Sequence, residues 1–181
     1  YEVQVADVED LPFSGEEFDA LSCRMGFMFF PDMQLSADEM HRVLKVGGRA
    51  SASVFGPATK NNWMALTIGV IGRYVEIPPA EPGMLGMFRR SAPGLMTGIF
   101  EYAGFKEVTE REIRGKVSFN SAEEYVQCLM EVTPLIVMLM NKADDNTQSK
   151  IKEGIYEAVA PYRQGDKLML DYSALVISGE K

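Results

Sequence analysis

The sequence has little of the two residue types that most often bind metals or form nucleophile–base pairs. Its 181 residues include two cysteines, Cys23 and Cys128, and one histidine, His41. No stretch has the spacing of a zinc site, such as two cysteines separated by two residues. A structural zinc site is therefore excluded. A Cys–His nucleophilic pair stays open, beside the more common role of cysteine as a small core residue.

Positively charged residues are also few: the chain has 18 lysines and arginines against 26 acidic residues, and its net charge is -8. Proteins that bind nucleic acids usually carry a basic patch or stripe. The nearest candidates are the pair Arg89 and Arg90 and the stretch 106–116, which acidic residues interrupt. We therefore expect neither a nucleic acid nor an anionic membrane surface as a partner.

Long apolar runs are absent, although 46% of the residues are apolar. No run approaches the roughly 20 residues that cross a bilayer, and the first residues do not resemble a signal peptide. The length suits one globular domain of ordinary size. We expect a single domain over residues 1–181, located in the cytoplasm.

Strand patterns alternate with helix patterns along the chain, which predicts an α/β fold with a mostly parallel sheet. Capping boxes at Ser36–Glu39 and Ser121–Glu124 predict two helix starts, and Gly47-Gly48 predicts the end of the first helix. Strands are predicted over 18–23, 50–55, 105–119 and 167–178, with the end of another strand at 1–5. Helices are predicted after Ser36, within 63–74, over 93–103, from Ser121 to about 132 and from 151 to 159, with a polar linker at 141–149.

Three segments in this order resemble one protein family. Residues 6–13 have acidic and small residues before Leu-Pro-Phe, residues 18–32 form an apolar strand and the loop beyond it, and residues 39–49 lead through Val-Leu-Lys-Val-Gly-Gly into the next strand. Together they resemble class I S-adenosylmethionine-dependent methyltransferases, in particular the ubiquinone/menaquinone C-methyltransferases that act on small molecules. Val46 replaces the proline that is usual in this family.

The resemblance implies a Rossmann-like sheet of strand order 3-2-1-4-5-7-6 with an antiparallel C-terminal strand, and S-adenosylmethionine as cofactor. It further implies that Asp7 accepts a hydrogen bond from the adenine amine and that the Val8 N–H donates to the adenine ring. Cys23, Arg24 and Met25 leave the fourth strand beside the methionine part of the cofactor. The alternatives are an ordinary turn aspartate at Asp7 and an ion pair of Arg24 with a local carboxylate.

The resemblance also implies that segments 56–92 and 119–148 cover the methyl acceptor. Phe29, Trp63 and Phe88 are the predicted acceptor contacts, and their character suits an apolar or aromatic small molecule. Ordinary core packing is the alternative for each of them. Because His41 follows Met40 on an amphipathic helix, we expect it to face solvent largely, and the sequence points to no catalytic residue.

One part of the family pattern is missing. No Gly-x-Gly turn occurs in the sequence, and Gly83 and Gly86 follow the fifth strand instead of the first. The resemblance therefore implies an N-terminally truncated domain without the first two strands, so that the fourth strand lies at an edge. We expect either residues 1–5 to pair beside that strand or two chains to form a homodimer by exchanging or joining their strand edges.

Three interpretations follow. The chain is part of a methyltransferase, or it is a catalytically silent fragment that binds itself or a partner through the sheet edge, or it is a binding module for an apolar ligand. The sequence leaves open whether this fragment is active.

Overall fold

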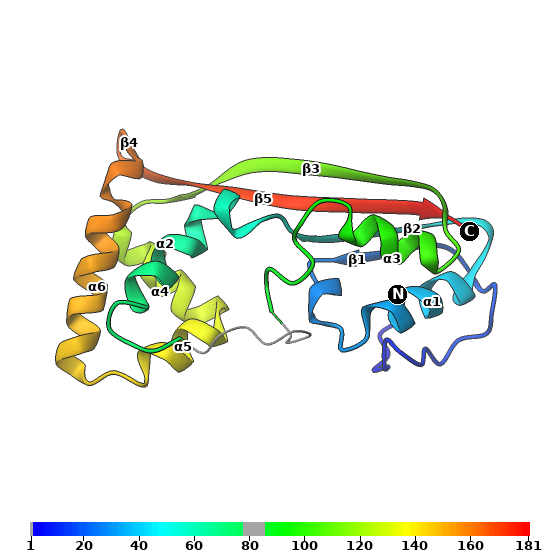
Figure 1. Ribbon diagram of the computed structural model, residues 1–181, viewed down its shortest axis with the longest axis horizontal. Helices are drawn as coiled ribbons and strands as arrows, with labels where there is room; N and C mark the ends of the chain where they lie inside the picture. Colours follow the sequence, from blue (N-terminus) through cyan, green and yellow to red (C-terminus); the bar gives the residue numbers. More distant parts are fainter. Residues whose placement is uncertain (1, 78–85) are drawn as a thin grey trace. The chain divides into compact units, whose positions relative to one another are not determined.

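The computed structural model describes residues 2–77 and 86–181 (Figure 1). Part of the predicted acceptor-covering segment 56–92 therefore lies outside the described residues. In chain order the elements are β1 (Phe18–Arg24), η1 (Phe27–Phe29), α1 (Met33–Val43), β2 (Leu44–Phe55), η2 (Ala58–Lys60), α2 (Asn62–Ile71), α3 (Leu95–Tyr102), β3 (Lys106–Phe119), α4 (Ala122–Val132), α5 (Pro134–Met140), α6 (Asp145–Val159), η3 (Ala160–Tyr162), β4 (Arg163–Gln164) and β5 (Lys167–Glu180).

The chain divides into two compact units. Unit 1 comprises the described residues of Tyr1–Pro57, Pro82–Ile113 and Ser173–Lys181, and unit 2 those of Ala58–Glu81 and Arg114–Tyr172. The long strands β3 and β5 contribute residues to both units. Each unit is described by itself below.

The strands form a mixed sheet in the order β1-β2-β5-β3, with β4 paired to β5 (Figure 1). β1 and β2 are parallel, whereas β5 runs antiparallel to β2. This confirms the predicted α/β class and the antiparallel C-terminal strand, and the order corresponds to 4-5-7-6 of the expected sheet. Because Arg24 pairs with Ser53, the carboxyl ends of β1 and β2 lie at the same edge of the sheet.

The prediction that residues 1–5 pair beside the fourth strand is wrong for the described part of that segment. Residues 2–6 form no strand, and the side chains of Val3 and Val5 are 86% and 99% exposed. The segment offers only these two alternating apolar side chains, which is too little to bury a face. Within the described residues, β1 is the end strand of the sheet.

Helix α1 begins earlier than its sequence predicts. Asp32 is the N-cap, and its carboxylate accepts hydrogen bonds from the N–H groups of Gln34 and Leu35. The Ser36 hydroxyl instead donates to the Asp32 carbonyl at 2.7 Å within the first turn. The capping box at Ser36–Glu39 is therefore wrong, because Asp32 satisfies the free N–H groups one turn earlier.

The same helix also ends earlier than predicted. It stops at Val43, and β2 starts at Leu44. Gly47, with φ of +81°, lies inside the strand, and its N–H donates to the Lys181 carbonyl at 3.0 Å. Sheet hydrogen bonding thus takes over before the two glycines are reached.

The core of unit 1 is built around three aromatic rings. Phe27, Phe100 and Phe105 are at most 4% exposed. The ring centroids of Phe100 and Phe105 lie 4.9 Å apart, and those of Phe27 and Phe100 lie 6.0 Å apart. Helices α1 and α3 pack together in this unit, so the cluster fixes η1 and α3 beside the sheet strands (Figure 1).

Unit 2 contains α2, α4, α5 and α6, which pack on one another. The Ser121 hydroxyl accepts from the Glu124 N–H at 3.1 Å, which confirms the second predicted helix start. Pro134 opens α5 at a first-turn position, where its missing N–H costs nothing. The predicted linker 141–149 is too long, because α6 already begins at Asp145 behind an Asp144 cap.

Tyr125 anchors unit 2 and is fully buried. Its hydroxyl lies 2.6 Å from the Thr67 hydroxyl and donates to the Trp63 carbonyl. Burial raises the pKa of Tyr125 to about 12, so the phenol stays neutral. Across the described residues, no helix is both long and apolar enough to pass through a bilayer.

Candidate functional site

The carboxyl ends of β1 and β2 are the natural place for a ligand in this sheet, because open α/β sheets bind ligands outside these ends. Two loops of unit 1 are candidates for such a site, and they are connected to each other at the start of α1. The first, residues 7–13, is called the acidic loop below. The second, residues 25–32, leaves β1 and leads into α1.

The acidic loop presents Asp7 to solvent. Its Oδ1 accepts a hydrogen bond from the Glu9 N–H at 3.0 Å, which is the turn geometry that the alternative interpretation predicts. A carboxylate can accept about four hydrogen bonds, so Asp7 can still accept others beside this turn contact. Val8 is half-buried, and its N–H has no partner among the described residues. An acceptor followed by a donor is the pair that adenine requires.

The acidic loop is connected to the second loop through Glu9. Its Oε1 accepts from the Asp32 N–H at 2.6 Å, directly at the start of α1. The Asp32 side chain also caps α1. Asp32 therefore connects the start of this helix to the acidic loop. The part of the acidic loop next to Asp7 is therefore held at the start of α1.

Cys23, Arg24 and Met25 lie where β1 ends, as predicted from the sequence. The Met25 N–H donates to the Ser53 carbonyl at 3.0 Å and to its hydroxyl at 3.1 Å. Met25 has φ of +54°, which is rare for a residue with a side chain and turns the chain sharply away from the strand. Arg24 is exposed and, over residues 2–77 and 86–181, has no carboxylate partner, which disfavours the ion-pair alternative.

The nucleophilic pair left open by the sequence has no support in unit 1. Burial raises the pKa of the Cys23 thiol, which keeps it protonated and weakly nucleophilic. His41 is half-buried, and its ring packs edge-on against Phe105 at 5.0 Å. The prediction that His41 faces solvent is wrong, because Phe105 and Gly104 enclose the ring. Burial also lowers the pKa of His41.

Two of the predicted acceptor contacts lie in unit 1. Phe29 is 46% exposed on η1, in the loop after β1. Phe88 packs against Phe55, the last residue of β2, with ring centroids 6.1 Å apart. The Arg89 guanidinium donates to the carbonyls of Phe30 and Pro31, which ties the Phe88 segment to the loop that carries Phe29.

Trp63 lies in unit 2, at the start of α2. Its indole N–H donates to the Asn61 side chain at 3.2 Å. The structure thus brings seven of the eight predicted residues to unit 1, and the predicted acceptor role of Trp63 stays a prediction.

Three contributors were missed by the sequence reasoning. Ser53 holds the Met25 turn, Arg89 holds the Phe88 segment, and Arg42 holds the acidic loop. Arg89 was noticed only as positive charge. None of these contacts leaves a local pattern in the sequence, because each partner lies 28 or more positions away.

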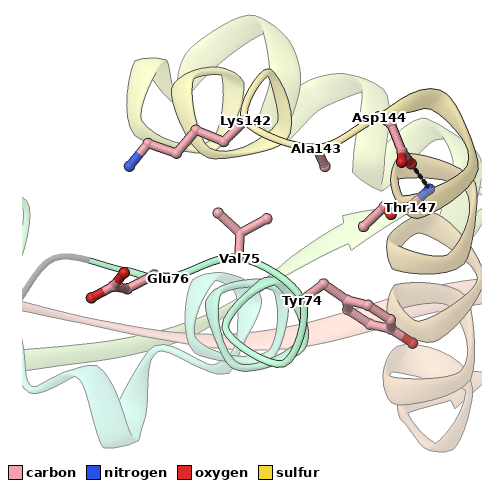
Figure 2. Close-up of a pocket in the computed structure, with 7 residues that line it drawn as sticks. All are labelled: Tyr74, Val75, Glu76, Lys142, Ala143, Asp144 and Thr147. Carbon is pink, nitrogen blue, oxygen red and sulfur yellow. Dashed lines mark hydrogen bonds between the residues drawn. The ribbon is translucent and has the colours of Figure 1, made fainter.

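Unit 2 carries an open depression of about 640 Å³ (Figure 2). Figure 2 shows Val75 between Glu76 and Lys142 on one side and Tyr74 and Asp144 on the other. The Asp144 carboxylate is engaged as a helix cap, accepting from the Thr147 N–H at 2.7 Å. The depression contains no predicted site residue, and no part of the described chain groups three potential metal ligands.

Comparison with known proteins finds sequence matches that include the N-terminal part of unit 1. Residues 1–52 match a family described as methyltransferase domain. An uncharacterized protein of Mycobacterium tuberculosis is 46% identical over 52 residues, covering 29% of this chain and 19% of that protein. Demethylmenaquinone methyltransferase of Staphylococcus carnosus is 28% identical over 121 residues, covering 62% and 50%.

Solved structures share the fold. The YcgJ protein of Bacillus subtilis has a TM-score of 0.53 and 18% identity, with 98% of this chain and 70% of that chain covered. A protein of Bacillus halodurans assigned as a methyltransferase has a TM-score of 0.53 and 16% identity, with 97% and 75% covered.

These matches support a class I S-adenosylmethionine-dependent methyltransferase. The sequence matches confirm the resemblance and support S-adenosylmethionine as the cofactor, and the solved structures confirm the Rossmann-like fold. The matched residues 1–52 include Asp7, Val8 and the turn at residues 23–25. The chain spans half or less of the length of these curated relatives.

Proposed function

We propose that unit 1 binds the adenosyl part of S-adenosylmethionine, and that the whole protein transfers a methyl group to a small apolar or aromatic acceptor. The observation that carries the proposal is the exposed Asp7 carboxylate followed by the Val8 N–H, which has no partner among residues 2–77 and 86–181. This pair matches the donor amine and acceptor nitrogen of adenine. Arg24 and the Met25 turn lie at the carboxyl end of β1 in the same unit and would contact the methionine part.

The residues of this chain supply position and exclusion of water. When bound, S-adenosylmethionine supplies an electrophilic methyl group, whose carbon bonds to the acceptor while its bond to sulfur breaks and leaves that electron pair on sulfur. Phe29, Phe88 and Phe55 offer an apolar surface for the acceptor. No side chain is assigned as a base, because the transfer itself requires only alignment of the reacting atoms.

Replacing Asp7 with asparagine is expected to weaken binding of S-adenosylhomocysteine about tenfold, because a charge-assisted hydrogen bond to the adenine amine becomes a neutral one. Isothermal titration calorimetry on the 181-residue chain measures the affinity. Asp10→Asn is the matched control, since it removes the same charge from the same loop. Equal affinity of the Asp7 variant and the parent chain would contradict the adenine contact.

The calorimetry also tests the parent chain. Absence of binding at millimolar cofactor would show that this polypeptide is a methyltransferase by descent only. The competing interpretation, a self-associating fragment, would then stand alone.

The two end strands of the sheet favour that competing function as a second candidate. β3 carries a row of charges along its length: Lys106, Glu107, Glu110, Arg111, Glu112, Arg114 and Lys116. β1 carries only Asp19 and Arg24, near its ends. Charged side chains protect exposed strand edges from pairing, and β1 lacks this protection. We infer that two chains join through β1 as a homodimer.

Placing a charge in the centre of β1 is expected to prevent this pairing. Ser22 is exposed and lies between Leu21 and Cys23, so Ser22→Lys adds the missing protection without entering the core. Sedimentation velocity should show a dimer for the parent chain and a monomer for the variant. Thr109→Lys, the same kind of change on β3, should remain dimeric. A parent chain that sediments as a monomer at all concentrations would rule out the homodimer.

A further inference from the structure

We propose that Glu39 and Arg42 of α1 act as a positioning pair that sets the acidic loop in its adenine-binding geometry. The inference rests on the proposed function and deepens it, because neither residue touches the cofactor. The pair instead determines where Asp7 and Val8 stand. It also explains a polar cluster on α1 that serves no other described purpose.

Glu39 and Arg42 make three hydrogen bonds to the backbone of the acidic loop. The Arg42 guanidinium donates from Nη1 to the Phe13 carbonyl at 2.8 Å and from Nη2 to the Leu11 carbonyl at 2.9 Å. Glu39 Oε2 accepts from the Leu11 N–H at 2.8 Å. Both backbone polar groups of Leu11 are therefore fixed by side chains of one helix.

The two side chains also fix each other. Arg42 Nε lies 2.6 Å from Glu39 Oε1, and Arg42 Nη2 lies 2.7 Å from Glu39 Oε2. This is the bidentate arrangement in which the planar guanidinium matches a carboxylate. Glu39 is only 14% exposed. The hydrogen bonds from Arg42 lower the pKa of Glu39, so that both partners are charged at neutral pH.

The acidic loop has few means of holding itself. Its own backbone bonds are Asp10 N–H to the Asp7 carbonyl and Phe13 N–H to the Leu11 carbonyl. A ring contact between Phe13 and Phe18 at 4.9 Å anchors its far end. The section that carries Asp7 and Val8 therefore depends on Glu39, Arg42 and the Glu9 contact to Asp32. Because Glu39 and Arg42 hold the loop in one conformation before the ligand binds, less conformational entropy is lost on binding.

A base-discrimination experiment separates positioning from general stability. The probes are S-adenosylhomocysteine and its inosine analogue, in which an oxygen replaces the adenine amine and cannot donate to Asp7. Calorimetry on the full 181-residue chain gives the ratio of the two affinities, and a thermal melt gives Tm. Arg42→Met removes the donors while keeping an unbranched apolar stem. Lys45→Met is the control, because it breaks the exposed Lys45–Asp19 ion pair in the same unit without touching the loop.

We expect the parent chain and Lys45→Met to prefer adenine about tenfold, and Arg42→Met to lose that preference. Arg42→Lys should restore part of it, because a single ammonium reaches one carbonyl but not the whole fork. A merely structural role would lower Tm and leave the ratio unchanged, and that result would overturn the proposal. A parent chain with no preference for adenine would overturn the proposed function itself, and the positioning role with it.

Amide hydrogen exchange provides a readout without ligand. The Leu11 amide donates to Glu39, so Arg42→Met should speed exchange at Leu11 by about tenfold or more relative to the amides of β2. Unchanged protection at Leu11 would show that the pair does not hold the loop.

Discussion

Replacing Phe100 with alanine is expected to lower the free energy of unfolding of unit 1 by about 3–5 kcal/mol, the usual cost of truncating a buried aromatic ring. Phe100 is fully buried and contacts the rings of both Phe27 and Phe105. Its removal leaves a cavity that two flanking rings cannot fill without leaving their own positions. Urea unfolding followed by circular dichroism measures the change.

Tyr102→Ala provides the matched control for Phe100. Both residues lie on α3, but Tyr102 is 82% exposed. The control should change the unfolding free energy by less than about 0.5 kcal/mol. Similar losses for the two variants would mean that ring burial in α3 does not stabilise the unit.

Replacing Gly56 with alanine has the next largest expected effect. A Cβ at this position would lie 2.2 Å from the Ser173 Oγ and 3.0 Å from its Cβ, so the segment that follows β2 or the Ser173 side chain on β5 must shift. The Gly56 N–H donates to the Ser173 carbonyl at 2.9 Å, which holds the backbones together. We expect a loss of about 2–3 kcal/mol in urea unfolding, as for other overpacked sites.

A double-mutant cycle tests the cause of that loss. Ser173→Ala removes the hydroxyl that the new methyl group would meet, together with its 2.7 Å hydrogen bond to Glu112. The loss from Gly56→Ala should be smaller in the Ser173→Ala background than in the parent chain. Additive losses would assign the effect to something other than the Ser173 hydroxyl.

Gly98 on α3 provides a control for the glycine-to-alanine change. A Cβ added there would meet no atom within 4 Å, so Gly98→Ala should slightly stabilise the chain.

Much of the fold follows from local sequence patterns because those patterns describe local physics. The apolar residues 174–177 predicted the C-terminal strand over 167–178, which is β5, and Gly104, with φ of +97°, ends α3 as its position after Ala103 predicted. Ser121 caps α4 for the same reason. In each case the stabilising interactions are made between residues close in sequence, so a short stretch of sequence is enough to predict them.

The start of α1 shows where such reasoning fails. Ser36 and Glu39 have the pattern of a capping box, but the structure shows that Asp32 caps the helix instead. The choice depends on where the chain arrives after η1, which packs its buried Phe27 and Met28 into the core. That packing is made by residues distant in sequence, and no local pattern contains it.

The candidate site divides in the same way. The loops with Asp7 and Arg24 could be proposed from the sequence because the segments that resemble the family, residues 6–13 and 18–32, contain them. The parts that position them could not, since Arg42 reaches carbonyls 29 and 31 positions away. On a helix wheel Arg42 is simply a polar residue beside an apolar stripe, which any solvated helix displays. Its partners become visible only when the loop is folded back over α1.

The unequal edges of the sheet would also limit the size of the assembly proposed above. A surface that repeats head to tail builds an open filament, whereas a patch that pairs with its own copy forms a closed pair. With β1 uncharged at its centre and β3 lined with charges, a sheet can be extended on one side only. Assembly would therefore stop at two chains. Raising the protein concentration should increase the fraction of chains in dimers without producing fibres.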